Sequence, residues 1–195
     1  MENSVRPMRA GDLDRAAAVL ADAFTGYPWT DWCVAADAHT ERLAGLQRIY
    51  LEHLALPYGA ADIDATGSGV AAFVPPDVPE PDESVVSRIV ELHGDRVGRL
   101  AEAEDQLSRL PADPDAWTLA TVGVARAGQG AGLGGALLAT GLEELDRHSR
   151  ACSLDTSTDR NLALYERHGF VVTGHVALDG GPQVWRMHRR AAHRA

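Results

Sequence analysis

The stretch Val122-Gly-Val-Ala-Arg-Ala-Gly-Gln-Gly-Ala-Gly-Leu-Gly-Gly-Ala-Leu-Leu138 decides the fold of this chain. It predicts a β-strand that ends at Val124, a loop with five glycines in the eight residues from Gly128 to Gly135, and a helix that begins at once. Glycines of this kind let successive backbone N–H groups converge at a helix N-terminus, where the helix dipole favours an anion. The loop is therefore predicted to bind a phosphate group.

Apolar periodicity on either side of this stretch predicts one α/β domain spanning residues 1–195, with a mixed sheet. Strands are expected over residues 4–8, 60–64, 69–74, 117–124, 151–155, 170–176 and 184–188. Helices are expected over residues 12–24, 38–56, 82–110 in two pieces, 133–148 and 161–167, the first with Asp12 as its N-cap. The segments 27–32 and 75–81 are expected to be loops, and 190–195 a frayed tail.

Composition excludes several classes of function. All 18 basic residues are arginine, so chemistry that needs a lysine amine, such as Schiff-base formation or a P-loop, is excluded. The net charge of −10 argues against nucleic acid and anionic membranes as partners. No signal peptide, membrane span or metal-ligand cluster is visible, and Cys33 and Cys152 are expected to be reduced. These features predict a cytoplasmic protein without a metal.

Two phosphate-containing ligands compete for the glycine loop. Gly130-x-Gly132-x-x-Gly135 matches a dinucleotide fingerprint, and Asp155 follows about 20 residues later, where a ribose-binding acid would lie. This alternative predicts an NAD(P)-dependent oxidoreductase. Against it, five residues separate Val124 from Gly130, and only 60 residues follow Gly135. A dinucleotide loop begins nearer its strand, and 60 residues cannot supply a second nucleotide-binding half.

The five residues between Val124 and Gly130 match the spacing of a different known motif. The pattern Val124-x-x-x-x-Gln129-x-x-Gly132-x-Gly134-x-x-Leu137 resembles motif A of the GNAT-type N-acetyltransferase superfamily. The segment Asn161-Leu-Ala-Leu-Tyr-Glu-Arg-His-Gly-Phe170 is similar to a second motif of that superfamily. The resemblance implies a mixed, mostly antiparallel sheet with a central splay, flanked by helices on both faces. It also implies acetyl-CoA as cosubstrate, with its pyrophosphate in the glycine loop.

Within the superfamily, the sequence is most similar to the puromycin N-acetyltransferase branch. The similarity lies in Trp117-x-Leu-Ala-Thr-Val-Gly-Val124, Tyr165-Glu-Arg-His-Gly-Phe170 and Ala23-Phe-x-x-Tyr-Pro28. It departs at Asp155, where that branch has glutamate, and it is faint over residues 77–115. The branch implies a small-molecule primary amine as acceptor and a role in antibiotic resistance. The protein is expected to be a monomer or a homodimer.

The resemblance assigns residues to the cosubstrate and to the acceptor. The residues expected to bind acetyl-CoA are Val122, Gly123, Val124, Gln129, Gly130, Ala131, Gly132, Leu133, Gly134, Gly135 and Asn161. Within this set, the backbone N–H of Val124 is expected to stabilise the oxyanion. The residues expected to bind the acceptor are Tyr27, Trp29, Asp31 and Trp117, because aromatic rings around a carboxylate suit a cationic or aromatic amine.

The sequence offers candidates for both proton transfers. Tyr165 is the expected general acid, because a phenol can deliver a proton to the departing sulfur. Asp155 is the first candidate for the base, acting through a water molecule, and Tyr27 and Asp31 are other polar candidates. Cys152 lies three residues earlier on the same strand, so it should face the opposite side of the sheet and not act as a nucleophile. A third alternative is an idle CoA-binding module, in which the loop is kept and the acceptor site is not.

Overall fold

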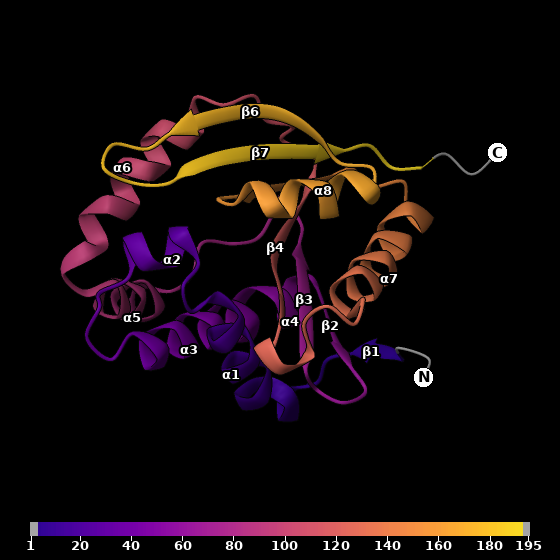
Figure 1. Cartoon of the computed structure of the whole chain (residues 1–195), viewed down its shortest axis with the longest axis horizontal. Helices are drawn as coiled ribbons and strands as arrows, with labels where there is room; N and C mark the ends of the chain where they lie inside the picture. The colour runs from indigo at the N-terminus through magenta and orange to yellow at the C-terminus, as the bar shows by residue number, and fades with distance from the viewer. Residues whose placement is uncertain (1–3, 193–195) are drawn as a thin grey trace.

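A seven-stranded sheet organises residues 4–192, the part of the chain that the computed structural model describes (Figure 1). The strands are β1 (Val5–Pro7), β2 (Ala60–Asp64), β3 (Gly69–Val74), β4 (Trp117–Val124), β5 (Cys152–Thr156), β6 (Val171–Ala177) and β7 (Gln183–Arg189). Their order in the sheet is β1-β2-β3-β4-β5-β7-β6. Every neighbouring pair is antiparallel except β4 and β5, which are parallel. The mixed, mostly antiparallel sheet is thus confirmed.

Helices cover both faces of the sheet (Figure 1). They are α1 (Leu13–Phe24), α2 (Pro28–Cys33), α3 (His39–Tyr50), α4 (Leu56–Tyr58), α5 (Glu83–His93), α6 (Val97–Ser108), α7 (Leu133–Arg147) and α8 (Asp159–Arg167). The predicted division of residues 82–110 into two helices is confirmed by α5 and α6. Helix α8 ends in a left-handed glycine, Gly169, where φ is +86°.

One local prediction was wrong, and two were right in position but not in detail. The expected loop 27–32 is mostly helix α2, because Pro28 occupies its first turn, where the missing N–H needs no partner. The expected helix 38–56 is α3 followed by a π-helical turn, Leu51–Ala55, and the chain stays helical through Tyr58. Asp12 holds the N-cap position but makes no side-chain cap, since its carboxylate binds the Arg6 guanidinium and the Arg9 N–H.

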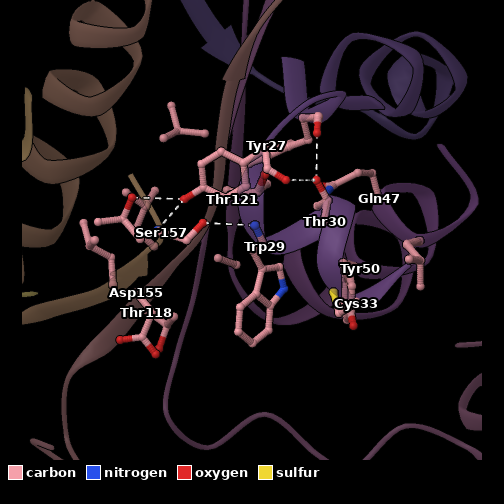
Figure 2. A pocket seen from close by; sticks show the side chains of 18 of the residues that line it. Tyr27, Trp29, Thr30, Cys33, Gln47, Tyr50, Thr118, Thr121, Asp155 and Ser157 are labelled. Carbon is pink, nitrogen blue, oxygen red and sulfur yellow. Dashed lines mark hydrogen bonds between the residues drawn. The ribbon is translucent and has the colours of Figure 1, made fainter. Parts of the chain in front are cut away.

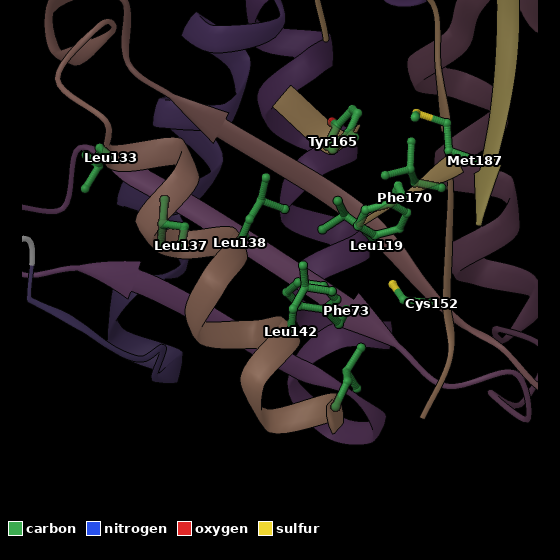
Figure 3. Packing of buried hydrophobic residues seen from close by; sticks show 13 residues of the cluster. Phe73, Leu119, Leu133, Leu137, Leu138, Leu142, Cys152, Tyr165, Phe170 and Met187 are labelled. Atoms are coloured by element: carbon green, nitrogen blue, oxygen red, sulfur yellow. The ribbon is translucent and has the colours of Figure 1, made fainter. Parts of the chain in front are cut away.

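Each face of the sheet has its own core. On one face, α7 and α8 pack Leu137, Tyr165 and Phe170 against Phe73 of β3 (Figure 3). Gly141 of α7 lies so close to the Phe73 ring that a Cβ would clash with it. On the other face, Leu20 of α1 and Leu51 pack against β2 and β3. The two cores clamp β3 and β4 in the middle of the molecule, so these strands form a rigid floor for any site beside them.

The central strands diverge as predicted. β4 pairs with β5 only at Trp117–Cys152 and Thr118–Ser153, although both strands continue beyond these residues. The β3–β4 register slips between Ala72 and Phe73, which leaves Ala120 as a β-bulge. A bulge bends its strand and increases local twist. The bulge thus turns the C-terminal half of β4 away from β5 and opens the splay.

The turn between β2 and β3 is built around Asp64, which is 3% exposed. Its carboxylate accepts hydrogen bonds from the backbone N–H groups of Thr66, Ser68 and Gly69, at 2.6–2.8 Å. Burial alone would raise the pKa of Asp64, but these hydrogen bonds together with the Thr66 hydroxyl lower it. The carbonyl of Ser68 in turn accepts the N–H of Ala125 at 2.8 Å. The turn therefore fixes the end of β4.

The end of β7 is tied to α7. Arg189 binds Asp146 through two hydrogen bonds of 2.7 Å, and the two side chains are 12% and 14% exposed. The N–H of Ala192 also donates to Asp146 at 2.9 Å. In the tail expected to fray, 190–195, this hydrogen bond anchors Ala192, and residues 193–195 lie outside the described part.

Asp62 of β2 is a buried carboxylate that should lower the stability at neutral pH. It is 8% exposed, and burial, with a smaller contribution from Glu144, raises its pKa to about 6. The folded state therefore holds this proton more tightly than the unfolded state, whose pKa is near ~3.9. Stability from this group is present below pH ~4 and is lost as pH rises through about 6.

Asp62→Asn is therefore expected to raise the free energy of unfolding at pH 7.5 by about 1–2 kcal/mol, after allowance for solvent screening. Urea denaturation at pH 5 and at pH 7.5 measures the effect, and the advantage of the variant should be larger at pH 7.5. Asp77→Asn, on the exposed connector, is the matched control. A variant less stable than wild type at pH 7.5 would contradict this account of Asp62.

Candidate active site

A cavity of about 450 Å³ opens beside the splay between β4 and β5 (Figure 2). Its floor is the β4 segment from Thr118 to Val122, and its opposite wall comes from α2 and α3. Leu100 and Leu107 of α6 also line it. The cavity thus combines backbone without a strand partner and a wall of apolar and aromatic side chains, which is typical of a small-molecule site.

Tyr27 and Trp29 join α2 to the end of β5. The Tyr27 hydroxyl accepts the N–H of Ser157 at 2.8 Å and lies 3.0 Å from the Thr156 hydroxyl (Figure 2). The N–H of Trp29 donates to the Ser157 hydroxyl at 3.2 Å. Asn161 of α8 donates to the same Thr156 oxygen at 3.3 Å. Tyr27, Trp29 and Asn161, predicted from two distant motifs, are therefore brought into one cavity wall.

Tyr165 extends from α8 to the cavity and is 7% exposed. Its ring contacts Phe170 edge-on, with 5.9 Å between centroids. Burial raises the pKa of Tyr165, and the nearby Tyr27 adds to the rise. The hydroxyl consequently keeps its proton at neutral pH and can act as a donor.

Asp155 also lines the cavity, and it is paired with Arg186 of the neighbouring strand β7. The guanidinium donates to both carboxylate oxygens, at 2.9 and 2.8 Å, and to the backbone carbonyl of Leu107 at 3.2 Å. Arg186 thus fixes the carboxylate and ties it to the end of α6. Cys152, three residues earlier, is buried in the core under α7, which confirms that it faces away from Asp155. Burial raises the pKa of its thiol to about 12.

Backbone donors of β4 point into the splay. The N–H of Ala125 donates toward β3, to Ser68. Since amide direction alternates along an antiparallel strand, the N–H groups of Val124 and Val122 point away from β3, toward the gap left by β5. The Val124 carbonyl faces the same gap and accepts the Gln129 side chain at 3.0 Å. The splay therefore presents a pair of N–H groups with no strand opposite them.

The glycine loop that follows is open. Gly130 and Gly132 have φ of +84° and +80°, and a Cβ at either position would meet no atom within 4 Å. Ala131, between them, is exposed. Helix α7 begins at Leu133, so its first N–H groups, including those of Gly134 and Gly135, have no partner within the helix. The space around Gly130 and Gly132 is open to an anion, and the N–H groups of the first helical turn lie next to it, so the loop fits a pyrophosphate.

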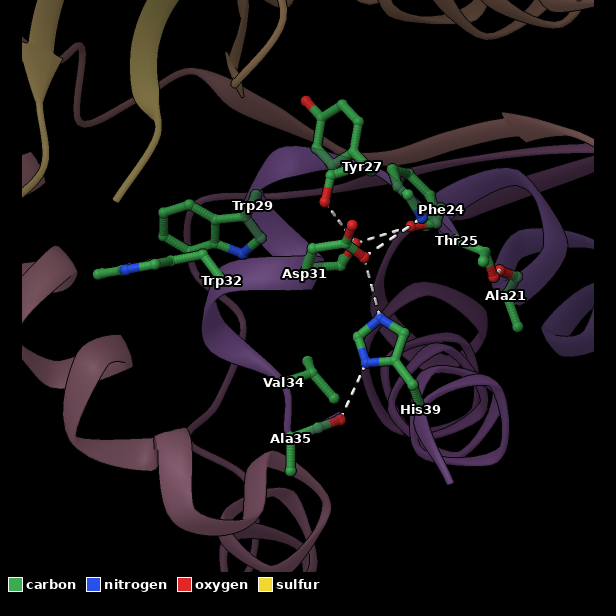
Figure 4. A network of polar contacts seen from close by, with 12 residues as sticks. Ala21, Phe24, Thr25, Tyr27, Trp29, Asp31, Trp32, Val34, Ala35 and His39 are labelled. Atoms are coloured by element: carbon green, nitrogen blue, oxygen red, sulfur yellow. Dashed lines mark hydrogen bonds and ion pairs between the residues drawn. The ribbon is translucent and has the colours of Figure 1, made fainter. Parts of the chain in front are cut away.

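Two predicted acceptor residues lie outside the cavity lining. Asp31 accepts the N–H of Gly26 at 3.2 Å and lies 3.2 Å from Nε2 of His39, so it braces α2 against α3 (Figure 4). Trp117 lies at the start of β4, at the paired end of the splay, and packs against the core under α7. Neither position favours contact with an acceptor.

The cavity also contains side chains that sequence analysis did not single out: Gln47 and Tyr50 of α3, His93 of α5, and Thr121 of β4. Gln47 and Tyr50 belong to the apolar face of a predicted helix. On such a face the sequence does not distinguish a polar group that lines a cavity from one that packs in the core. Among residues 4–192, no group of three or more His, Cys, Asp or Glu side chains could hold a metal. No helix in this range is long and apolar enough to cross a membrane.

Comparisons with known proteins agree with this geometry. The model of the Acetyltransferase (GNAT) family matches residues 64–170, from the β2–β3 turn to the end of the second motif. A Corynebacterium glutamicum structure, described as histone acetyltransferase HPA2 and related acetyltransferase, is 25% identical, with a TM-score of 0.75. The alignment covers 100% of this chain and 99% of that one.

Two further solved structures share the fold at lower identity. The ribosomal-protein-S18-alanine N-acetyltransferase of Escherichia coli is 16% identical, with a TM-score of 0.59 and coverage of 99% and 96% of the two chains. YncA from Salmonella typhimurium, solved with its cofactor acetyl-CoA, is 16% identical, with a TM-score of 0.57 and coverage of 100% and 97%. None of these findings supports the dinucleotide alternative.

Proposed function

Because the chain belongs to the GNAT acetyltransferase family, we propose that it transfers the acetyl group of acetyl-CoA to the primary amine of a small molecule without an anionic group. The enzyme class and the cosubstrate follow from the family. The open glycine loop directly after the splayed strand is the observation that carries the proposal, because it leads a phosphate-bearing cosubstrate into the cavity.

Different groups of this chain bind the cosubstrate, stabilise the oxyanion and transfer the two protons. The N–H groups from Gly130 to Gly135 hold the diphosphate, and Asn161 and the splayed edge of β4 border the path to the cavity. Acetyl-CoA supplies an acetyl group activated as a thioester. The Val124 N–H, with Val122 beside it, donates to the thioester oxygen as negative charge develops there. Tyr165 gives its proton to the departing sulfur, and Asp155 takes the amine proton through a water molecule.

The lining of the cavity supports a non-anionic acceptor. Among the described residues that line it, Asp155 is the one with a formal charge at pH 7, and no arginine is present. A carboxylate or phosphate on the acceptor would therefore be buried without a cation to pair with it, which is costly. The rings of Phe24, Tyr27 and Trp29 instead favour an aromatic or apolar body. Puromycin, an aromatic aminonucleoside without an anionic group, fits this description and the sequence resemblance.

A thiol-release assay with acetyl-CoA tests the proposal. Puromycin, tyramine, tyrosine and a short peptide with a free N-terminal amine are the acceptors. We expect kcat/KM for tyramine or puromycin to exceed that for tyrosine at least 100-fold, since tyrosine adds one carboxylate to tyramine. Equal use of tyrosine, or preference for the peptide, would contradict the acceptor class. Tight CoA binding without turnover of any amine would favour an idle module.

Gly132→Ala should weaken CoA binding at least 10-fold. The added Cβ would enter the open space of the glycine loop, where the diphosphate is expected to bind. The left-handed φ of +80° also costs a non-glycine residue about 1–2 kcal/mol. Isothermal titration with CoA measures the affinity, and Gly98→Ala on α6, where a Cβ also meets open space, is the control. Unchanged affinity in Gly132→Ala would place the diphosphate elsewhere.

Asp155→Asn keeps one oxygen for Arg186 and removes the group that takes the amine proton. We expect kcat to fall about 100-fold with little change in CoA affinity. Steady-state kcat and the CoA dissociation constant, both measured in wild type and variant, check this expectation. A variant with wild-type kcat would remove Asp155 from the mechanism.

A further inference from the structure

Three residues that line the cavity each carry a buried polar atom with no hydrogen-bond partner among residues 4–192: Gln47 Oε1, His93 Nε2 and Thr121 Oγ1. His93 is 4% exposed and Thr121 is 8% exposed. A buried polar atom left without a partner costs about 1–3 kcal/mol. Three of them in one cavity indicate a ligand that supplies the missing hydrogen bonds.

The hydrogen bond of His93 defines what the ligand must offer. Nδ1 lies 2.7 Å from the backbone carbonyl of Cys33, and a carbonyl oxygen can only accept. Nδ1 therefore carries a proton, and in the ring with a single proton Nε2 is an acceptor. Gln47 Oε1 is also an acceptor. Two acceptors call for a donor on the ligand, either a hydroxyl or an amino group.

The place of these atoms separates them from the transfer chemistry. Gln47 lies with Tyr50 on α3, across Tyr27 from Asp155 and Ser157 (Figure 2). His93 lies at the end of α5, which packs on α3. Thr121 alone comes from β4, one residue beyond the bulge at Ala120. The two acceptors therefore belong to the α3–α5 wall, away from the end where Tyr165 and the Val124 N–H meet the cosubstrate.

The surroundings of this wall restrict the rest of the ligand. Leu43, Leu46 and Leu51 also line the cavity. The part of a ligand that lies between its hydrogen-bond donor and its reacting amine would therefore contact apolar side chains. Polar sites of this kind discriminate strongly, because an analogue that lacks the donor leaves the buried acceptors unpaired.

We propose that Gln47 and His93 form a recognition site for a second hydrogen-bond donor on the acceptor, at the opposite end from the reacting amine. This inference rests on the proposed function. It predicts a substrate with two polar ends and an apolar or aromatic middle: a primary amine that is acetylated, and a hydroxyl or amino group that is recognised. Thr121 adds a third hydrogen bond between the two ends.

Matched pairs of amines that differ by hydroxyl against methyl test the proposal. The first pair is tyramine and 4-methylphenethylamine, and the second is 4-(4-hydroxyphenyl)butylamine and 4-(4-methylphenyl)butylamine, so that two lengths are sampled. In the wild type, kcat/KM for the hydroxyl member of at least one pair should exceed that of its methyl partner 10-fold or more. The dissociation constants of the same amines, measured with CoA bound, should show the same preference.

Two pairs of variants locate the preference. Gln47→Met removes the acceptor while nearly keeping its volume, and Gln106→Met on α6, outside the cavity lining, is its control. His93→Asn keeps a donor for the Cys33 carbonyl but removes the atom at Nε2, whereas His93→Gln restores a polar group there. Gln47→Met and His93→Asn should each reduce the hydroxyl preference to about 1–3-fold. Gln106→Met should keep it, and His93→Gln should recover it in part.

The results separate this inference from the proposed function. Turnover without a hydroxyl preference at either length, or a preference unchanged in both Gln47→Met and His93→Asn, overturns the recognition site and leaves the acetyltransferase proposal intact. Absence of turnover with a hydroxyl preference in binding overturns the proposed acceptor class but supports the recognition site. If neither turnover nor preferential binding is found, both are overturned. Should one variant fail to fold, the other decides, because each removes a different acceptor.

Discussion

Replacing Arg189 with methionine is expected to lower the free energy of unfolding by about 3–5 kcal/mol. The guanidinium binds both oxygens of Asp146 at 2.7 Å, and a third hydrogen bond of 2.9 Å reaches the carbonyl of His168. Methionine would fill most of the volume but leave the Asp146 carboxylate in a site only 14% exposed. Taking the guanidinium away from a carboxylate that is mostly buried is among the costliest single changes in a protein.

Urea denaturation monitored by circular dichroism measures the loss. Arg190→Met, at the exposed neighbouring position, is the control and should change stability by less than about 0.5 kcal/mol. The double variant Arg189→Met with Asp146→Leu removes both charges and should recover much of the stability lost in the single variant. A single variant within about 1 kcal/mol of wild type would show that the ion pair does not hold β7 to α7.

Tyr165→Phe is expected to lower kcat at least 100-fold while stability and CoA affinity change little. The phenyl ring keeps the edge-on contact with Phe170, so the core under α7 stays filled. Only the hydroxyl is lost, and with it the proton donor for the departing sulfur. Proton transfer by a positioned side chain contributes typically ~10²–10⁴-fold to a rate. Burial makes a thiolate in this place costly, which increases the need for a donor.

Pre-steady-state measurement of thiol release, with the amine that the wild type uses best, separates chemistry from product release. Tyr58→Phe, at a side chain 49% exposed, is the control and should behave as wild type. Thermal unfolding with and without CoA verifies that the Tyr165→Phe variant still binds CoA at its glycine loop. Wild-type kcat in this variant would assign the proton to another group or to water.

Local sequence was sufficient to predict the structure where turn residues, apolar periodicity or a motif fix the backbone conformation. The hairpin from Ala60 to Val74 and the glycine loop after Val124 have the bounds that turn residues and apolar periodicity predicted. Tyr27 and Asn161 reached the cavity because each belongs to a motif whose neighbours fix its direction. In these places the residue type and the backbone conformation constrain each other.

Sequence was insufficient where long-range packing decides. Helix α2 is six residues long, too short to form on its own propensity, and it is held by contacts from Tyr27 and Trp29 to Ser157. Trp117 and Asp31 resembled acceptor residues by composition, but the register of β4 with β5 and the packing of α2 on α3 direct them elsewhere. His93 ends an amphipathic helix in sequence and becomes a cavity residue only when α5 meets α3.

A crystal structure of the CoA complex tests the central claim most directly. The account predicts the diphosphate on the N–H groups of Gly130 to Gly135, the pantetheine arm along the splayed edge of β4, and the sulfur within hydrogen-bonding distance of the Tyr165 hydroxyl. A diphosphate bound away from this loop, or a sulfur that lies outside the cavity beside β4 and β5, would contradict it.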